Sequence, residues 1–255
     1  MKRKVYFMLR DFSQEQFDIV IQAGQSNSEG CGLGAATAPF VPSSDILYLQ
    51  NDFSICAAHE YVAGNEIVGN FSLAFCTEYI NSGKLQLGRK ILIIRAAVGG
   101  TGFLDHHWGL SDDLYLRMMD LIQTALELNS ENRLIALLWH QGETDAIMNA
   151  DQPTHFNHLS TMINSVRNLF ACQDLPFIAG DFVSQWKNDN LAICLPVIAA
   201  MKDVCASIGQ ARFVETDELQ SNDQKIGNLD TIHFCREAID QLGVKYFNAY
   251  CDITR

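Results

Sequence analysis

The sequence predicts an α/β fold in which a mainly parallel sheet is covered by helices on both faces. Three observations predict it. Short apolar runs suited to buried strands recur along the chain, helical patterns lie between them, and no repeat or low-complexity linker interrupts the alternation. With 255 residues the chain can bury a full core, and we expect one domain over residues 1–255.

The strands are expected where apolar residues run continuously, as they do in a parallel sheet that is buried on both faces. These segments are residues 18–22, 90–96, 133–139, 176–181 and 211–214. A region without this rhythm, 40–69, contains two short apolar runs around the Asn51-Asp52 turn. We expect 46–49 and 53–56 to form a small hairpin at the edge of the sheet.

The helices are expected between these strands. One begins near Ser111 and places Leu114, Met118, Ile122 and Ala125 on one face. The other helical patterns cover residues 71–80 before Gly83, 155–170, 196–208 before Gly209 as the C′ residue, and 234–250.

Net charge limits the classes of partner. The formal charge is −12 and the sequence pI is near 4.9. Nucleic acid and anionic membrane surfaces are therefore disfavoured, because phosphate binding needs a basic patch. Anionic substrates are mildly disfavoured, although a local pocket can override net charge.

Cysteine usage indicates a reducing compartment. The eight cysteines are scattered without a C-x-x-C pair, and several lie inside apolar runs, where free cysteine acts as a small hydrophobe. The basic start at 2–4 resembles a secretory n-region, but the apolar stretch 5–9 is too short to follow it as an h-region. We expect a cytoplasmic protein with no membrane-spanning segment.

Chemistry-bearing residues cluster after the predicted strands. Ser26, in Gly24-Gln25-Ser26-Asn27, follows the first strand, where open α/β sheets place their ligands. The block lacks the second glycine of the G-x-S-x-G hydrolase elbow, and alone it is more typical of a loop or a helix cap than of a nucleophile.

Two further blocks follow the second and third predicted strands. Gly99-Gly100-Thr101 allows close approach of backbone N–H groups to a ligand, although by itself it is also an ordinary turn. The segment Trp139 to Asp145 concentrates polar groups at a strand end, where Gln141 can donate to an oxyanion and Glu143 can order a loop or contact a histidine. Glu143 and Asp145 as helix-capping residues are the alternative.

The last block is Asp230-Thr231-Ile232-His233. An aspartate three residues before a histidine can hold one imidazole nitrogen while the other faces a nucleophile. Together with Ser26 these residues supply the nucleophile, base and orienting acid of serine-based acyl transfer. His106 and His107 beside Asp105 have no second ligand cluster, so a zinc hydrolase is disfavoured and no cofactor is expected.

These four blocks, in this order, resemble those of the SGNH hydrolase superfamily, and their wording is most similar to its carbohydrate-esterase branch of acetylxylan esterases and sialate O-acetylesterases. The matching segments are the G-Q-S-N block at 24–27, the glycine block at 99–101, W-x-Q-G-E-x-D at 139–145 and D-x-x-H-F at 230–234. The resemblance spans about residues 18–240.

The resemblance implies a flavodoxin-like three-layer α/β/α sandwich and a serine esterase that removes O-acetyl groups from carbohydrates through an acetyl-enzyme. It implies Ser26, Asp230 and His233 as catalytic residues. Its oxyanion hole consists of the Ser26 and Gly100 N–H groups and the Gln141 amide, where other branches use an asparagine. Either Asp230 or Glu143 is then the main acidic partner of His233. The partner is a small-molecule or oligosaccharide acetyl ester, and no metal or organic cofactor is required. Among such esters, the negative net charge favours neutral acetylated sugars over sialic acid.

Three alternatives remain. A short-chain lipase or thioesterase requires an apolar acyl groove. A non-catalytic carbohydrate-binding protein on the same fold predicts a broken triad, whereas Ser26, Asp230 and His233 are all present. An interaction protein with the same core leaves the four polar blocks unexplained. Four loop residues are expected either to stack on a sugar or to anchor buried loops, namely Phe103, His106, Trp108 and Trp186.

Overall fold

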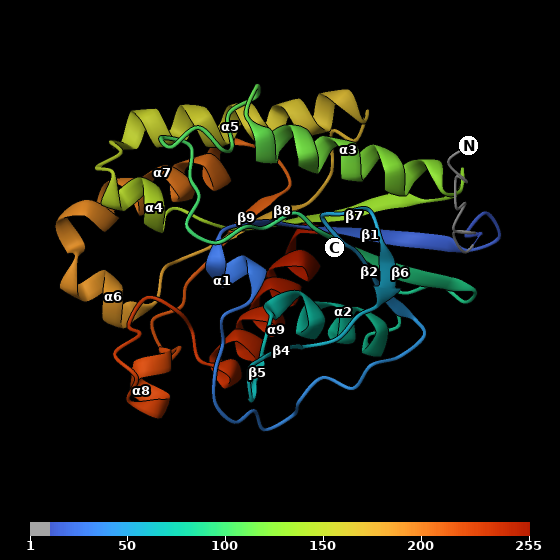
Figure 1. Ribbon diagram of the computed structural model, residues 1–255. Coiled ribbons are helices and arrows are strands. Elements are labelled where there is room, and N and C mark those ends of the chain that lie inside the picture. Colours follow the sequence, from blue (N-terminus) through green and yellow to red (C-terminus); the bar gives the residue numbers. More distant parts are fainter. Residues whose placement is uncertain (1–10) are drawn as a thin grey trace, which may run out of the picture.

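A seven-stranded sheet lies between two layers of helices in the computed structural model, which describes residues 11–255 (Figure 1). The segments 2–4 and 5–9, considered above as a leader, lie outside the described residues. All five strands expected from apolar runs are present, and the three-layer α/β/α prediction is confirmed.

The elements have the following bounds. The strands are β1 (Gln16–Gly24), β2 (Ile46–Leu49), β3 (Ile55–Ala57), β4 (Tyr61–Ala63), β5 (Glu66–Val68), β6 (Arg89–Arg95), β7 (Arg133–His140), β8 (Phe177–Gly180) and β9 (Ala211–Val214). The helices are α1 (Ser26–Glu29), α2 (Phe71–Asn81), α3 (Asp113–Glu127), α4 (Glu143–Ile147), α5 (Gln152–Leu169), α6 (Ser184–Asp189), α7 (Leu191–Ser207), α8 (Asn222–Ile226) and α9 (Arg236–Ile253).

The strand order of the sheet is β3-β2-β6-β1-β7-β8-β9, and every neighbouring pair is parallel except β2 and β3. The run β6-β1-β7-β8-β9 has the flavodoxin-like strand order. After β1 the chain forms β2 and then β6 on one side of β1, and it later forms β7 on the other side. The carboxyl ends of β1 and β7 therefore meet at a topological switch point, where open α/β sheets bind ligands.

Each face of the sheet has its own hydrophobic core. One core joins the sheet to α3, α5 and α7, with Trp108 and Trp139 among its largest buried side chains. The other joins it to α2 and α9, around Phe71 and Tyr246. Figure 1 shows α3, α5 and α7 above the sheet and α1, α2 and α9 below it.

The predicted helix ends are right in two cases and wrong in two others. Gly83 follows the C-cap of α2 with φ of 75°, as a C′ glycine does, and α3 presents the predicted apolar face. Pro196 was expected to start its helix but lies inside α7, which begins at Leu191. Gly209 is not the left-handed C′ residue of that helix, because Ile208 is already extended and Gln210 adopts φ of 56°.

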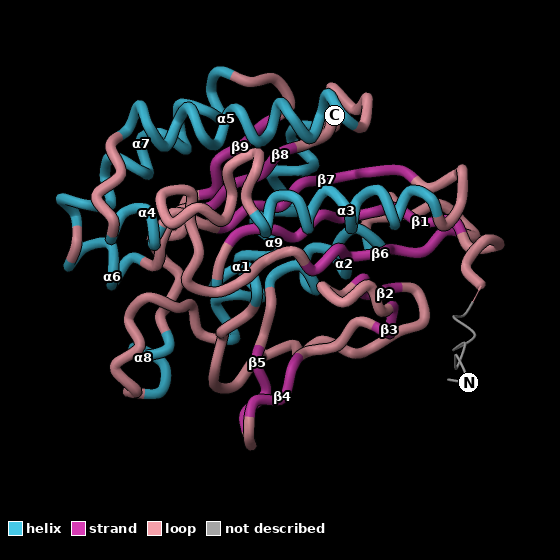
Figure 2. Tube along the Cα trace, turned by 45° about the horizontal axis from the view of Figure 1, so that its top comes forward, coloured by secondary structure: helices cyan, strands magenta, loops and turns pink. Residues whose placement is uncertain are grey.

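The edge hairpin is confirmed, and a second one accompanies it. β2 and β3 pair antiparallel around the predicted turn, so that β3 forms the edge of the sheet. β4 and β5 pair separately and project from the body beside this edge (Figure 2). Their three-residue strands are too short to give a periodic signal in the sequence.

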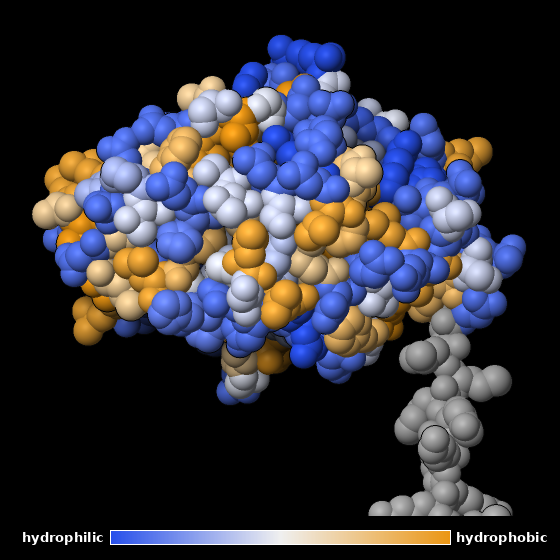
Figure 3. Space-filling view, turned by 90° about the horizontal axis from the view of Figure 1, so that it is seen from above, coloured by the Kyte–Doolittle hydropathy of each residue, from blue (hydrophilic) through white to orange (hydrophobic). Residues whose placement is uncertain are grey.

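The outer face over α3 and α5 intersperses hydrophilic residues with small hydrophobic areas (Figure 3). Over residues 11–255, no helix has both the length and the hydropathy required to cross a bilayer. All eight cysteines are free thiols, in agreement with their scattered positions in the sequence.

A buried carboxylate joins the amino-terminal ends of the three central strands. Asp18 of β1 is fully buried and binds Arg89 Nε of β6 at 2.6 Å and Arg133 Nε of β7 at 2.7 Å. Tyr79 of α2 donates to its other oxygen at 2.8 Å. Burial opposes ionisation, but the hydrogen bonds from Arg133, Tyr79 and Arg89 outweigh it and lower the pKa of Asp18.

Replacing Asp18 by alanine leaves the Arg89 guanidinium buried without its counter-ion. We expect Asp18→Ala to lower the free energy of unfolding by about 3–5 kcal/mol, measured by urea denaturation at neutral pH. Lys202→Gln, which breaks an exposed pair with Glu215, is the matched control and should cost less than about 1 kcal/mol. An equal, small effect of both variants would contradict this role for Asp18.

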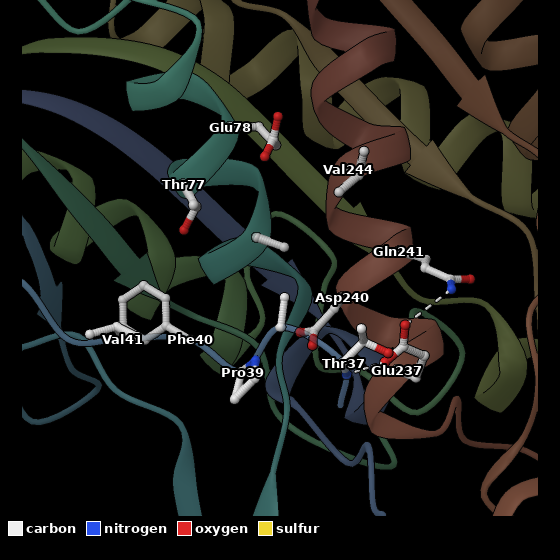
Figure 4. A pocket seen from close by; sticks show the side chains of 12 residues that line it. Thr37, Pro39, Phe40, Val41, Thr77, Glu78, Glu237, Asp240, Gln241 and Val244 are labelled. Carbon is white, nitrogen blue, oxygen red and sulfur yellow. Dashed lines mark hydrogen bonds between the residues drawn. The ribbon is translucent and has the colours of Figure 1, made fainter. Parts of the chain in front are cut away.

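A cavity of about 470 Å³ lies between α2, α9 and the segment 37–41 (Figure 4). Its lining is largely apolar, yet Asp240 of α9 points into it and its Oδ2 atom has no hydrogen-bond partner among the described residues. Burial, followed by repulsion from Glu60 and Glu237, raises the pKa of Asp240 to about 7 despite nearby Arg236.

Because the folded state binds this proton more tightly than the unfolded chain, Asp240 destabilises the fold as the pH rises from about 4 to about 7. We expect Asp240→Asn to flatten the dependence of Tm on pH over this window and to raise Tm at pH 8 by at least about 2 °C. Calorimetry from pH 5 to pH 8 measures this. Parallel Tm curves for the two proteins would contradict the prediction.

Candidate active site

The structure brings the three predicted residues Ser26, His233 and Asp230 into one hydrogen-bonded chain. Ser26 Oγ lies 2.8 Å from His233 Nε2, and His233 Nδ1 lies 2.9 Å from both carboxylate oxygens of Asp230. The side chains of His233 and Asp230 are 24% and 25% exposed, so the chain of contacts is open to a ligand. It has the geometry in which an imidazole removes a hydroxyl proton while a carboxylate fixes its tautomer.

Ser26 is placed by a sharp turn at the end of β1. Gly24 adopts φ of 122°, and a side chain there would collide with the carbonyl oxygen of His140 at the end of β7. The same carbonyl accepts a hydrogen bond from Gln25 N at 2.9 Å. Glycine is therefore required for β1 and β7 to close on each other and present Ser26 at the switch point.

Backbone donors surround the serine. As the first residue of α1, Ser26 carries an N–H that has no acceptor within its helix. Gly99 lies beside it, since a Cβ atom built on Gly99 would be 3.4 Å from Ser26 Cβ. Gly99 N donates to Glu29 Oε2 at 2.8 Å, whereas no described residue accepts from the N–H of Gly100. Neither of the two predicted backbone donors, Ser26 N and Gly100 N, therefore has an acceptor among the described residues.

Asn27 connects the serine to the segment that carries the histidine. Its Nδ2 donates to the Ile232 carbonyl at 3.0 Å and to Glu143 Oε1 at 2.8 Å, and its Oδ1 accepts from Phe234 N at 3.1 Å. Asn27 is fully buried. These bonds hold the backbone on both sides of His233 against the residue that follows Ser26. The supporting role of this side chain was not predictable from the sequence pattern.

Glu143 lies behind Asn27 and has no hydrogen bond to His233. It is fully buried, and its Oε2 atom has no partner among the described residues. Burial raises the pKa of Glu143, and the bond from Asn27 only partly offsets this. Asp230 is accordingly the acidic residue in contact with the His233 side chain. Glu143 is connected to the backbone around His233 only through Asn27.

The neighbour of Glu143 on β7 is an uncharged histidine. Burial lowers the pKa of His140 to about 3. The Tyr246 hydroxyl donates to the Trp139 carbonyl at 2.8 Å, so its oxygen accepts from His140 Nδ1 at 3.1 Å. His140 Nε2 is then unprotonated and faces Glu143 Oε1 at 3.9 Å. His140 therefore brings no positive charge that could compensate a charge on the buried Glu143 carboxyl.

Gln141 is held by a second buried carboxylate. Its Nε2 donates to Asp145 Oδ2 at 2.8 Å, which leaves the second hydrogen of the amide for another acceptor. Asp145 also accepts from the backbone N–H groups of Phe103 and Leu104, both at 2.9 Å. Burial opposes ionisation of Asp145, but His155 Nδ1, 3.3 Å from Oδ2, and the bonds from Leu104 and Gln141 outweigh it and lower the pKa of Asp145. Asp145 therefore ties the loop after the glycine block to Gln141.

Gly142 and Gln25 complete the link between the first and third blocks. Gly142 adopts φ of 144°, and a side chain there would meet the Phe182 ring at 2.8 Å. Gln25 Oε1 accepts from Thr144 N at 3.1 Å at the start of α4. The turn that separates Gln141 from Glu143 is thus fixed by glycine and by a side chain next to Ser26.

Asn222 supports the carboxylate of Asp230. It donates from Nδ2 to Asp230 Oδ2 and to the Cys31 carbonyl, both at 2.9 Å. Burial tends to raise the pKa of Asp230, but the bonds from Asn222 and His233 outweigh it, and the pKa is lowered. Asp230 therefore remains ionised at neutral pH. Asn222 is another functional-site residue without a signal in the sequence.

The aromatic loop residues anchor the fold. Trp108 is fully buried, its Nε1 donates to Thr101 Oγ1 at 3.0 Å, and Phe103 and Trp186 are also buried. A sugar-stacking role is therefore wrong for these three, and burial as loop anchors is correct. His106 is exposed at φ of 64°.

No cluster of three or more histidine, cysteine or acidic side chains suited to a metal occurs within residues 11–255. His107, considered above beside Asp105, binds Asp113 Oδ1 through Nδ1 at 2.8 Å.

Fold and site together define an SGNH-like carbohydrate esterase. The family described as "Carbohydrate esterase, sialic acid-specific acetylesterase" matches residues 16–252, which is nearly the whole chain. The chain belongs to this family, and it is a carboxylic ester hydrolase.

Known relatives agree with this assignment. A protein of Arabidopsis thaliana called "Probable carbohydrate esterase At4g34215" is 24% identical over 221 residues, covering 82% of this chain and 75% of its own length. Its crystal structure superposes with a TM-score of 0.75 over 93% of this chain and 98% of its own.

Two further structures share the fold. NanS superposes with a TM-score of 0.77 at 17% identity, covering 95% of this chain and 99% of its own. XAC1771, a carbohydrate acetylesterase from Xanthomonas citri, reaches 0.62 at 15% identity, over 92% of this chain and 56% of its own. At these identities the superpositions show the fold alone.

The contacts of Glu143 lead to a prediction that separates positioning from charge. Glu143→Ala removes the acceptor of Asn27, so the segment around His233 loses support, and we expect kcat for 4-nitrophenyl acetate to fall about 100-fold. Glu143→Gln keeps an acceptor oxygen and should remain within about 5-fold of wild type with an unchanged pH–rate profile. If Glu143→Gln lost as much activity as Glu143→Ala, a negative charge at this position would be required instead.

Proposed function

We propose that the protein is a serine esterase that removes O-acetyl groups from carbohydrates through an acetyl-enzyme, and that residues 1–255 act as one catalytic domain. The observation that carries this proposal is the chain of contacts from Ser26 Oγ through His233 to Asp230 at the switch point of the sheet. The family match supplies the carbohydrate ester class.

In the first step His233 Nε2 accepts the proton of Ser26 Oγ as this oxygen attacks the acetyl carbonyl carbon. The tetrahedral oxyanion accepts hydrogen bonds from Ser26 N, Gly100 N and the second hydrogen of the Gln141 amide. His233 then protonates the sugar oxygen as its bond to the acetyl carbon breaks. Asp230 holds Nδ1–H and stabilises the imidazolium that forms.

In the second step water attacks the acetyl-enzyme while His233 accepts a proton from it. The second tetrahedral intermediate collapses, the proton returns to Ser26 Oγ, and acetate leaves. Each step needs the imidazole within hydrogen-bond reach of the serine oxygen, as the 2.8 Å distance provides.

The site favours this function over the alternatives. A non-catalytic binding protein has no need for a serine, imidazole and carboxylate in hydrogen-bonded register. A lipase needs an apolar acyl groove. The cavity next to α1, the short helix that begins at Ser26, instead has polar and charged residues in its lining, namely Glu29, Gln50, Asn51 and Arg95.

The nucleophile is tested by Ser26→Ala, which we expect to lower kcat for 4-nitrophenyl acetate by about 10⁴–10⁶-fold. Wild-type activity should fall steeply from the acetate to the butyrate and octanoate esters. Asp230→Asn should cost about 10⁴-fold, because the imidazole then loses its fixed tautomer. Near-normal turnover by Ser26→Ala would exclude the proposed mechanism.

A further inference from the structure

A cavity of about 500 Å³ lies next to the end of α1, the short helix that begins at Ser26, and is separate from the cavity of Figure 4. It is formed by the end of α1, the turn after β2, strand β4 and the end of β6. The side chains that matter here are Glu29, Cys31, Gln50, Asn51, Tyr61 and Arg95.

This cavity adjoins Ser26 through Glu29. Glu29 is the last residue of α1, the helix that Ser26 begins, and its Oε2 accepts from Gly99 N at 2.8 Å. Gly99 in turn lies next to Ser26, as the 3.4 Å approach of a built Cβ atom shows. A substrate whose ester group sits at Ser26 can therefore extend past the glycine block into the cavity.

Arg95 is the unusual member of the lining. It ends β6, directly after the apolar residues 91–94, and is only 5% exposed. One nitrogen, Nη2, donates to the Glu29 carbonyl at 2.6 Å, whereas Nη1 is buried and has no hydrogen-bond partner among the described residues. No carboxylate within residues 11–255 lies within 4.0 Å of its nitrogens, unlike Arg236, which pairs with Glu60 at 2.7 Å.

Two aromatic rings hold this guanidinium in place. Arg95 Cζ lies 5.0 Å from the centroid of the Tyr48 ring and 4.8 Å from that of Tyr61. The two rings stack on each other at 6.5 Å with an angle of 7° between their planes. Tyr61 is fixed by a bond from its hydroxyl to Gln50 Oε1 at 3.1 Å. Cation–π contacts of this kind orient a cation without neutralising it.

The lining also offers an unused acceptor. Asn51 Oδ1 is buried without a hydrogen-bond partner among the described residues. Buried polar atoms are normally paired, and a buried arginine stays charged and normally has an anionic partner. A donor that carries a positive charge and a neutral acceptor are thus both available in one cavity.

We propose that this cavity binds the carboxylate of an acidic sugar, with Arg95 as the residue that determines specificity for it. A guanidinium matches a carboxylate through parallel N–H bonds, and Asn51 Oδ1 accepts from a neighbouring sugar hydroxyl. Glu29 brings a negative charge to the same lining, but its Oε2 is occupied by Gly99 N–H. This inference rests on the proposed function, and it reverses the preference for neutral sugars that net charge suggested.

The test compares each acid with its own methyl ester. Acetate release is measured for O-acetylated sialic acid, for O-acetylated glucuronic acid, and for the carboxyl methyl ester of each. We expect wild-type kcat/KM to be at least about 10-fold higher for one acid than for its methyl ester, mainly through KM. Arg95→Gln should lower kcat/KM for that acid about 10- to 100-fold and abolish the preference, while 4-nitrophenyl acetate turnover changes less than about 3-fold.

Arg212→Gln, on β9, is the matched control and should keep the preference. If Arg95→Gln also loses 4-nitrophenyl acetate turnover, Arg95→Lys decides, because it keeps the charge and should keep part of the preference. Loss of all preference in Arg95→Lys would then overturn the proposal.

Two negative results have different meanings. Ser26-dependent hydrolysis with equal kcat/KM for both acids and their methyl esters overturns the carboxylate site and leaves the esterase function intact. Absence of Ser26-dependent hydrolysis of any acetyl ester, including 4-nitrophenyl acetate, overturns the proposed function and with it the inference built on it.

Discussion

The arrangement of the site depends on the carboxamide of Asn27. This side chain follows Ser26, the proposed nucleophile, and binds the backbone on both sides of His233, at residues 205 and 207 positions further along the chain. An imidazole can take a proton from Ser26 only if this distant segment stays in register, and the two bonds from Asn27 set that register. The Ser26–His233 distance of 2.8 Å follows from it.

The hydrogen bond that supports Asn27 requires a buried carboxyl group, that of Glu143. A fully buried carboxyl beside a neutral His140 is an unfavourable place for a charge, and burial accordingly raises the pKa of Glu143. Glu143 lies in this unfavourable position because its Oε1 accepts the hydrogen bond from Asn27. Asp230, by contrast, is partly exposed, bonded by Asn222 and His233, and remains ionised. Two carboxyl groups near one histidine thus have different environments and different partners.

Much of the fold could be predicted from the sequence because parallel strands buried on both faces leave continuous apolar runs. The five runs each became a strand, and the Asn51-Asp52 turn marked the edge hairpin. The limits of α7 were not predictable from Pro196 and Gly209, because the chain tolerates Pro196 inside the helix and places the left-handed residue at Gln210.

At the candidate site, the residues proposed to carry the chemistry could be predicted from the sequence, but the residues that support them could not. Ser26, Asp230 and His233 are brought together, and Gly100 and Gln141 have N–H groups left over for a ligand. The support from Asn222 depends on contacts between distant segments, for which one sequence has no periodic signal. Arg95, proposed here to bind a carboxylate, does stand out in the sequence, because its charge directly follows the apolar residues 91–94.

The central claim is that Ser26 forms the covalent intermediate. Its most direct test is labelling by a small organophosphate ester, which reacts with activated serines, followed by peptide mapping by mass spectrometry. We predict a single label on Ser26 that abolishes ester hydrolysis, and no label in Ser26→Ala. Labelling of another residue with loss of activity, or full activity in protein labelled at Ser26, would contradict the claim.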